Sequence, residues 1–331
     1  MLKKQELKNV CLFKKYAFHK SCMDPIATEL TRLKVDFMME SKRHKIYDMS
    51  GEDNQFKIFI LADEWAQLYR KNAKILCTTG HSMASKGTTL DIKNHDMDYI
   101  YVPSQYYKTE LLRRGVFPKK EIIVTGYPAS DLIFNYQNER VGERRSRILI
   151  APTYNKDLSI MDALMILERD IKLFKSLEEY DILFKVHPVL PKKYPLQMEF
   201  CRELSSKYDH VMCVEDTHDD ISTSILWADI MIGDSSGALL LGAAGDIPII
   251  AYDNFNRIRS EYYDPTGPEW AFRDKFASII NDETIHDLPG LIKYLLEDDF
   301  QKESRQEVVN FLFEHQADAG FQIAKHIQSL L

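Results

Sequence analysis

The chain has 331 residues, a net charge of −7, and 45% hydrophobic and 28% charged residues. This length predicts two domains, and the acidic balance argues against binding nucleic acid through a basic surface. No apolar run approaches the ~20 residues that cross a bilayer, and the lysine-rich start lacks the apolar core of a secretory signal. The five cysteines are scattered without a Cys-x-x-Cys pair, which favours reduced thiols in a cytoplasmic protein.

The first half of the chain alternates short apolar runs with amphipathic segments. One expected helix covers 25–33, with Asp24 as its N-cap and Pro25 in its first turn. A second is expected after residue 62 and ends near Lys71, and a third covers 106–114. The expected strands cover 10–13, 35–39, 56–62, 74–78, 99–103 and 122–125.

The same alternation restarts after a charged stretch at 138–147. The expected strands cover 148–151, 180–186, 211–214, 230–232 and 248–252, and the expected helices cover 161–176, 219–228, 238–244, 285–296 and 301–330, with a break at Gly320. Two such series predict an α/β protein with two Rossmann-like, doubly wound domains facing a cleft. The expected domains are 1–140 and 141–310, and a C-terminal helix over 311–331 is expected to cross back to the first domain.

A polar turn follows the expected strand at 230–232 and opens the next helix. It reads Gly233-Asp234-Ser235-Ser236-Gly237. Ligands bind at the carboxyl ends of strands in open α/β sheets, and backbone N–H groups at a helix start attract anions. The turn therefore predicts an anion site. The alternative is an ordinary helix start, in which Asp234 caps the helix or orients the serine hydroxyls.

Histidine and lysine follow two further expected strands. His81 and Ser82 come after the strand at 74–78, and Lys86 lies five residues beyond His81, so a base and a cation could share one small site. Lys185 and His187, followed by Pro188, end a buried strand and suit a diphosphate. The alternative for each is a structural loop residue. The sequence has no P-loop, dinucleotide fingerprint, His-Glu-x-x-His or Gly-x-Ser-x-Gly motif.

Together these segments resemble the CDP-glycerol glycerophosphotransferase family, whose members build teichoic acids and related capsular polymers. The matching segments, in order, are His81 with Lys86, Val102-Pro103-Ser104, Gly126-x-Pro128-x-x-Asp131, Ala151-Pro152-Thr153, Lys185-x-His187-Pro188, Asp229 to Ser236, Pro248 and Tyr252-Asp253. Ser82 and Ser235 stand where the family has glycine and tyrosine, and Ala129 stands where it often has a basic residue. The resemblance covers residues 10–255.

The resemblance implies a GT-B fold and a transferase. It would move glycerol phosphate or ribitol phosphate from a CDP-linked donor to a hydroxyl of a glycan or lipid-linked polymer, without a tightly bound cofactor. His81 would be the general base, with His187 as a second catalytic residue. The implied donor site comprises Thr153, Lys185, His187, Pro188, Gly233, Asp234, Ser235, Ser236 and Gly237, and the implied acceptor or phosphate contacts are His19, Ser82 and Lys86.

The expected partners are the nucleotide-diphosphate donor and the glycan or lipid-linked acceptor, with transient peripheral contact at the inner face of the cell membrane and no nucleic acid. Two alternatives stay open for the function. One is a GT-B transferase or epimerase that uses a UDP- or CMP-activated sugar, and the other is a non-catalytic nucleotide-sugar-binding protein. No metal-ligand cluster stands out, so cationic side chains are expected to replace a metal, with an externally held Mg²⁺ as the open alternative. The oligomeric state is also open.

Overall fold

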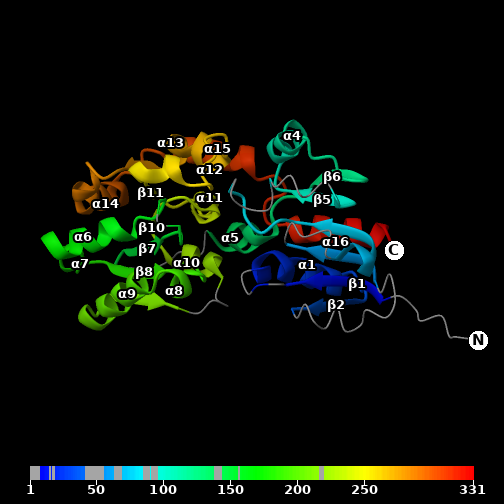
Figure 1. Ribbon diagram of the computed structural model, residues 1–331, viewed down its shortest axis with the longest axis horizontal. Coiled ribbons are helices and arrows are strands. Elements are labelled where there is room, and N and C mark those ends of the chain that lie inside the picture. The colour runs from blue at the N-terminus through cyan, green and yellow to red at the C-terminus, as the bar shows by residue number, and fades with distance from the viewer. Residues whose placement is uncertain are drawn as a thin grey trace, which may run out of the picture. The chain divides into compact units, whose positions relative to one another are not determined.

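The computed structural model describes residues 8–14, 16, 19–41, 56–62, 69–84, 90, 96–137, 144–155, 157–215 and 220–331. The chain forms two compact units (Figure 1). Unit 1 contains the described residues of 1–83, 87–132 and 311–331, and unit 2 contains those of 84–86 and 133–310. Each unit is built on one parallel sheet of six strands, which confirms the predicted α/β architecture.

The sheet of unit 1 has the strand order β2-β1-β3-β4-β5-β6, and all its pairs are parallel. The chain starts at β1, next to one edge of the sheet, adds β2 at that edge and then adds β3 to β6 on the other side of β1. Each predicted strand of this half is present to within two residues at either end. The strands are β1 (Lys8–Phe13), β2 (Phe37–Glu40), β3 (Phe56–Leu61), β4 (Ala73–Thr78), β5 (Tyr99–Val102) and β6 (Glu121–Val124).

The first helix of unit 1 differs from the prediction. α1 covers Lys20–Arg32, so Asp24 is not its N-cap and Pro25 lies inside it. Proline interrupts a helix interior because it lacks an N–H. Here the buried face formed by Cys22, Met23, Ile26 and Leu30 offsets that lost bond, because it packs the helix on the sheet. Most of the helix predicted to end near Lys71 lies outside the described residues. In the part that is described, Arg70–Asn72 form one 3₁₀ turn.

The C-terminal end of the chain returns to unit 1. α16 (Ala319–Ser329) lies beside α1 (Figure 1), and α4 (Gln105–Arg113) and α5 (Asp131–Tyr136) complete the described helices of the first half. The predicted break at Gly320 is wrong, because the break lies at 313–318 and Gly320 is in the first turn of α16. A Cβ there would lie 2.8 Å from the backbone carbon of Pro25. Glycine therefore permits the close approach of the two helices.

The sheet of unit 2 has the strand order β12-β11-β10-β7-β8-β9. This is the 3-2-1-4-5-6 order of a Rossmann fold, since β7, β8 and β9 run to one side and β10, β11 and β12 to the other. The sequence missed only β12, which has three residues. The strands are β7 (Arg147–Ala151), β8 (Asp181–Lys185), β9 (Val211–Val214), β10 (Ile230–Gly233), β11 (Ile249–Tyr252) and β12 (Ser278–Ile280).

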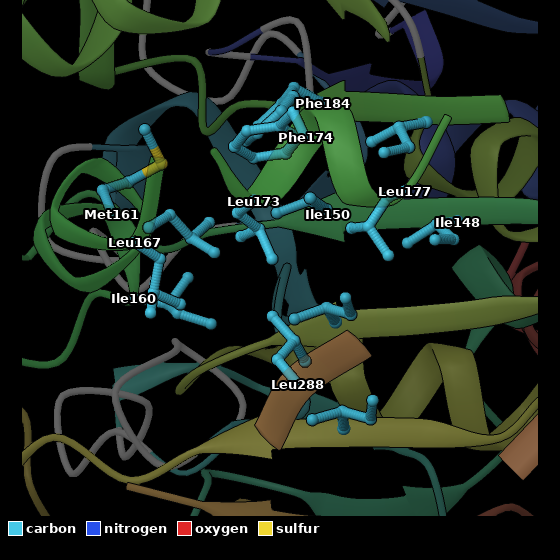
Figure 2. Close-up of a cluster of buried hydrophobic side chains, with 14 of the residues drawn as sticks. Ile148, Ile150, Ile160, Met161, Leu167, Leu173, Phe174, Leu177, Phe184 and Leu288 are labelled. Carbon is cyan, nitrogen blue, oxygen red and sulfur yellow. The ribbon is translucent and has the colours of Figure 1, made fainter. Parts of the chain in front are cut away.

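The helices of unit 2 bury an apolar cluster against this sheet. Figure 2 shows Ile148 and Ile150 of β7 and Phe184 of β8 near Phe174 and Leu288 of the covering helices. The helices are α6 (Met161–Ile171), α7 (Leu173–Ser176), α8 (Leu190–Lys193), α9 (Pro195–Lys207), α10 (Ile221–Trp227), α11 (Gly237–Ala244), α12 (Pro268–Ala271), α13 (Arg273–Phe276), α14 (Leu288–Glu297) and α15 (Lys302–Leu312).

The single helix predicted over 161–176 is two helices. Lys172 adopts the left-handed conformation with φ of 54° and separates α6 from α7. The buried carboxylate of Glu168 accepts a hydrogen bond from the backbone N–H of Phe174, at 3.1 Å. That bond satisfies an N–H that the interruption would leave unpaired, so the apolar period continues while the helix does not.

Candidate functional site

In each sheet the order in which strands are added changes direction at one place, and several of the predicted site residues lie at or beside these two places. In unit 1 the reversal lies between β1 and β3, and in unit 2 between β7 and β10. Loops from neighbouring strands diverge at such a switch point and leave a crevice at the carboxyl ends, where α/β proteins bind ligands. Thr153 and Asp234 follow β7 and β10, and His19 follows β1.

Asp234 joins the two loops that meet at the switch point of unit 2. Its carboxylate accepts hydrogen bonds from the backbone N–H groups of Thr153 (3.0 Å), Ile160 (3.1 Å) and Ser235 (2.6 Å), and its side chain is fully buried. Asp234 therefore ties the loop after β10 to the loop after β7. The alternative that it caps α11 is wrong, because Ser236 is the cap and its hydroxyl accepts from Ala238 N–H at 3.2 Å.

The start of α11 presents two backbone donors. Within the part of the chain that the structure describes, no acceptor takes the N–H groups of Ser236 and Gly237. They lie at the positive end of the α11 dipole, which favours an anion. Gly233 permits the close packing of β10 on α11, because a Cβ there would approach the Leu239 side chain to 2.8 Å. The local geometry is thus suited to a phosphate group.

Lys185 and His187 follow β8, the strand next to β7. Lys185 is the last residue of β8 and is only 8% exposed. The Nδ1 atom of His187 accepts the backbone N–H of Val189 at 3.2 Å, so the proton of the neutral ring lies on Nε2. His187 is therefore arranged as a hydrogen-bond donor. The ring of Tyr154, which follows Thr153, packs 4.6 Å from the His187 ring.

The predicted donor residues thus come from three adjacent parallel strands, β8, β7 and β10, and all follow the carboxyl ends of those strands. Lys185, Thr153 and Ser235 are buried, whereas His187, Pro188, Ser236 and Gly237 are partly exposed. The structure brings these residues to one edge of the unit 2 sheet, as expected for strand ends in a parallel sheet.

His81 lies at the switch point of unit 1. Its Nδ1 lies 2.8 Å from the carbonyl oxygen of Ala62, which follows β3. A carbonyl only accepts, so Nδ1 carries the proton and Nε2 is the basic nitrogen. The ring of His19, which is fully buried, stacks on the ring of His81 with centroids 5.0 Å apart and planes 24° apart. Ser82 is partly exposed beside His81, and Lys86 lies outside the described residues.

The two histidines therefore hold opposite tautomers. His81 offers an unprotonated Nε2, which can take a proton, whereas His187 offers a protonated Nε2, which can donate a hydrogen bond. A general base must have the first form and a ligand for a phosphate oxygen the second. The backbone contact of each Nδ1 thus sets the tautomer of each neutral ring.

Sequence reasoning missed Arg273, which lies beneath the loop that starts at Asp234. Its Nη1 donates to the carbonyl oxygen of Asp234 and its Nη2 to that of Tyr252, both at 2.6 Å. Burial lowers the pKa of Arg273 to about 10. No signal in the sequence could reveal this position, because arginine is usually on the surface.

The segment from Gly126 to Asp131, which matches a family motif, anchors the C-terminal helix. The carboxylate of Asp131 accepts the backbone N–H groups of Ala319 (3.0 Å) and Gly320 (2.8 Å) at the start of α16. Gly126 has φ of 82°, and a Cβ there would lie 2.5 Å from the Glu314 carbonyl oxygen. Burial raises the pKa of Asp131 to about 7, although both N–H groups oppose that shift.

The described residues contain neither a cluster of metal ligands nor a helix suited to cross a membrane. No group of three histidine, cysteine or acidic side chains there is arranged to hold a metal ion. None of the helices described here combines the length and apolarity that a membrane span needs.

Several solved structures have folds similar to that of this chain. The wall teichoic acid polymerase TagF is 18% identical, with a TM-score of 0.68 over 97% of this chain and 89% of that chain. A TagF variant soaked with CDPG is 14% identical, with a TM-score of 0.71 over 100% and 90%. S. aureus MnaA, in a co-structure with UDP, is 12% identical, with a TM-score of 0.64 over 98% and 96%. These likenesses confirm the predicted GT-B fold.

No curated protein has a sequence that matches this chain significantly. A family model does match, however, and it extends over residues 68–319, which include His81, Asp131, Lys185, His187 and the Asp234 turn. This match confirms the resemblance that the motifs indicated and the prediction of a transferase. The chain belongs to the CDP-Glycerol:Poly(glycerophosphate) glycerophosphotransferase family.

Proposed function

We propose that the protein transfers a polyol phosphate from CDP-glycerol, or a close analogue such as CDP-ribitol, to a hydroxyl of a cell-wall or capsular polymer. The observation that carries this proposal is the start of α11, where the N–H groups of Ser236 and Gly237 lie at the switch point of the unit 2 sheet. Lys185 and His187 follow the same edge of that sheet. The family supports the CDP-linked donor, as does the TagF variant soaked with CDPG.

In the proposed reaction unit 2 holds the donor and unit 1 supplies the base. The acceptor hydroxyl attacks the phosphorus that carries the polyol, and Nε2 of His81 takes the hydroxyl proton. A new O–P bond forms, the bond from that phosphorus to the bridging oxygen breaks, and CMP leaves with the bond's electron pair. The electrons and the single proton therefore balance without a redox partner.

The groups proposed around the donor stabilise the charge that grows on the leaving CMP. The Nε2–H of His187 can donate a hydrogen bond to a phosphate oxygen, and the ammonium of Lys185 carries the opposite charge to the phosphate. The two N–H groups at the start of α11 are already in place before the CDP-linked substrate binds. Preorganised donors of this kind are a large source of rate enhancement in phosphoryl transfer. Thr153 and Pro188 are proposed to line the nucleoside part, and Ser82 and Lys86 the acceptor part.

A binding panel tests the donor class. We expect CDP-glycerol or CDP-ribitol to raise the melting temperature, and UDP-N-acetylglucosamine to have a much smaller effect. A ligand at 100 times its Kd stabilises the folded state by about 2.7 kcal/mol. Preferential stabilisation by the UDP-sugar would favour a sugar transferase or epimerase instead. Binding of CDP-glycerol without turnover on any polyol-phosphate acceptor would favour a binding protein.

The catalytic proposal is tested on His81→Ala. A general base contributes ~10²–10⁴-fold, so kcat should fall by about that factor. The Kd of CDP-glycerol should stay within about twofold, because the proposed donor contacts all lie in unit 2. His286→Ala, on an exposed turn of unit 2, is the matched histidine control. A folded His81→Ala protein with normal kcat would remove His81 from the mechanism.

A further inference from the structure

Arg273 joins the ends of two neighbouring strands. β10 and β11 pair in parallel, and the last paired residues are Gly233 and Ala251. The carbonyl groups that bond to Arg273 belong to the next residues, Asp234 and Tyr252. The guanidinium therefore gives one charged N–H to each strand just where the ladder between β10 and β11 ends. Arginine suits this place because its planar fork offers two parallel donors.

The bond to Asp234 fixes the first peptide of the turn. Arg273 holds the carbonyl oxygen of the Asp234–Ser235 peptide, and the Asp234 carboxylate holds its N–H at 2.6 Å. The plane of this peptide is therefore set from both sides. The next two N–H groups along the chain are those of Ser236 and Gly237, the proposed phosphate donors. A rotation of the Asp234–Ser235 peptide would redirect both of them.

The surroundings of Arg273 are unusual for a buried cation. It is only 4% exposed, and its Nε has no hydrogen-bond partner among the residues that the structure describes. Within the described residues, no carboxylate lies within 4.0 Å of its nitrogens, although Asp234, Asp253 and Glu269 are its acidic neighbours. The Trp270 ring lies 4.5 Å from the guanidinium carbon and holds its plane. Burying a charge with carbonyl partners alone is costly for stability.

Because burying the Arg273 guanidinium costs stability, its hydrogen bond to the Asp234 turn points to a role in shaping that turn. We propose that Arg273 is a positioning residue, which holds the Asp234 turn in the shape that presents the Ser236 and Gly237 N–H groups to a diphosphate. The inference rests on the proposed function in one respect, namely that the anion is part of a CDP-linked donor. The anion-binding shape itself can be tested without a nucleotide, because inorganic pyrophosphate would use the same N–H groups.

The same unit contains a matched control. Arg305 is also buried, at 1% exposure, but it forms ion pairs with Asp246 (3.2 Å) and with Asp299. Asp246 follows the far end of α11, about 12 Å along the helix axis from the turn at its start. Removing Arg305 therefore removes a buried guanidinium from unit 2 without touching the Asp234 turn.

The test compares Arg273→Met and Arg273→Lys with Arg305→Met by calorimetric titration with pyrophosphate, CDP and cytidine, alongside thermal melts. We expect Arg273→Met to weaken pyrophosphate and CDP binding about tenfold, as for a lost hydrogen bond to a charged group, and to leave any cytidine binding unchanged. Arg273→Lys should show an intermediate loss, and it serves as the test if the Met variant does not fold. Arg305→Met should lower the melting temperature and leave all three affinities unchanged.

Other outcomes overturn the inference. Normal pyrophosphate affinity in a folded Arg273→Met protein would show that the turn keeps its shape without the guanidinium. An equal loss for cytidine, or the same loss in Arg305→Met, would reduce Arg273 to a general structural role. If the unaltered protein binds pyrophosphate but not CDP, the proposed donor fails while Arg273 is still tested. If it binds neither, the anion site and the role of Arg273 both fail.

Discussion

Replacing Asp234 with asparagine tests whether one carboxylate holds the switch point of unit 2 together. The carboxylate accepts three backbone N–H groups from two separate loops, and Ile160 N–H reaches only Oδ2. Asparagine keeps one oxygen and turns an NH₂ group toward at least one of these donors. A buried donor without an acceptor costs about 1–3 kcal/mol. Including the lost charge assistance, Asp234→Asn should lower the free energy of unfolding by about 2–4 kcal/mol.

Urea denaturation measures this effect, with Ser236→Ala as the control. That variant removes only the cap of α11 and should cost about 1 kcal/mol. Asp234→Asn should also weaken CDP-glycerol binding, because the loops after β7 and β10 lose their common anchor. A loss of unfolding free energy below about 0.5 kcal/mol, the usual range for a surface substitution, would refute this reasoning.

Three further predictions concern unit 1. His19→Ala should lower kcat because it removes the ring that stacks on His81. His19→Phe keeps an aromatic ring and should retain more activity. Equal losses of kcat in both variants would contradict the stacking argument. Asp131 has a folded pKa of about 7, above the unfolded value of about 3.9, so its contribution to stability falls as pH rises between these values. We compare the unfolding free energies of the unaltered protein and of Asp131→Asn. The excess stability of the unaltered protein should decrease by up to about 1.4 kcal/mol per pH unit from pH 4 to 7. A difference that stays constant with pH would be contrary evidence. Gly320→Ala should lower the free energy of unfolding by about 1–3 kcal/mol, because the new Cβ meets the Pro25 backbone. Gly290→Ala, which has open space at its Cβ in α14, is the control and should be neutral or stabilising. Equal melting temperatures of the two variants would count against the close helix contact.

The sequence predicted the strand ends well because those signals are local. Short apolar runs that stop at Lys185 or Gly233 are typical of parallel strands, and the residues after them must lie on one edge of the sheet. The order of the motifs along the chain then indicated the family. These two sources of information were sufficient for the fold and for the placement of the candidate donor residues at one edge of the unit 2 sheet.

The sequence could not predict what depends on distant contacts. Asp234 resembles a helix cap locally, but its partners Thr153 and Ile160 are over 70 positions away. Pro25 suggested a helix start, yet tertiary packing extends α1 before it. Arg273 has no local signal at all, since its burial depends on where α13 docks. The tautomers of His81 and His187 likewise depend on the backbone around each ring, including a carbonyl 19 positions from His81.

The central claim is that the reaction cleaves the donor at the phosphorus that carries the polyol. The most direct measurement is ³¹P NMR of the purified protein with CDP-glycerol and a glycerol-phosphate-primed acceptor, with His81→Ala run in parallel. We expect CMP to appear in equal amount to a new phosphodiester, and both signals to be lost in the variant. Release of CDP in place of CMP would mean attack at carbon, as in a sugar transfer, and would contradict the account.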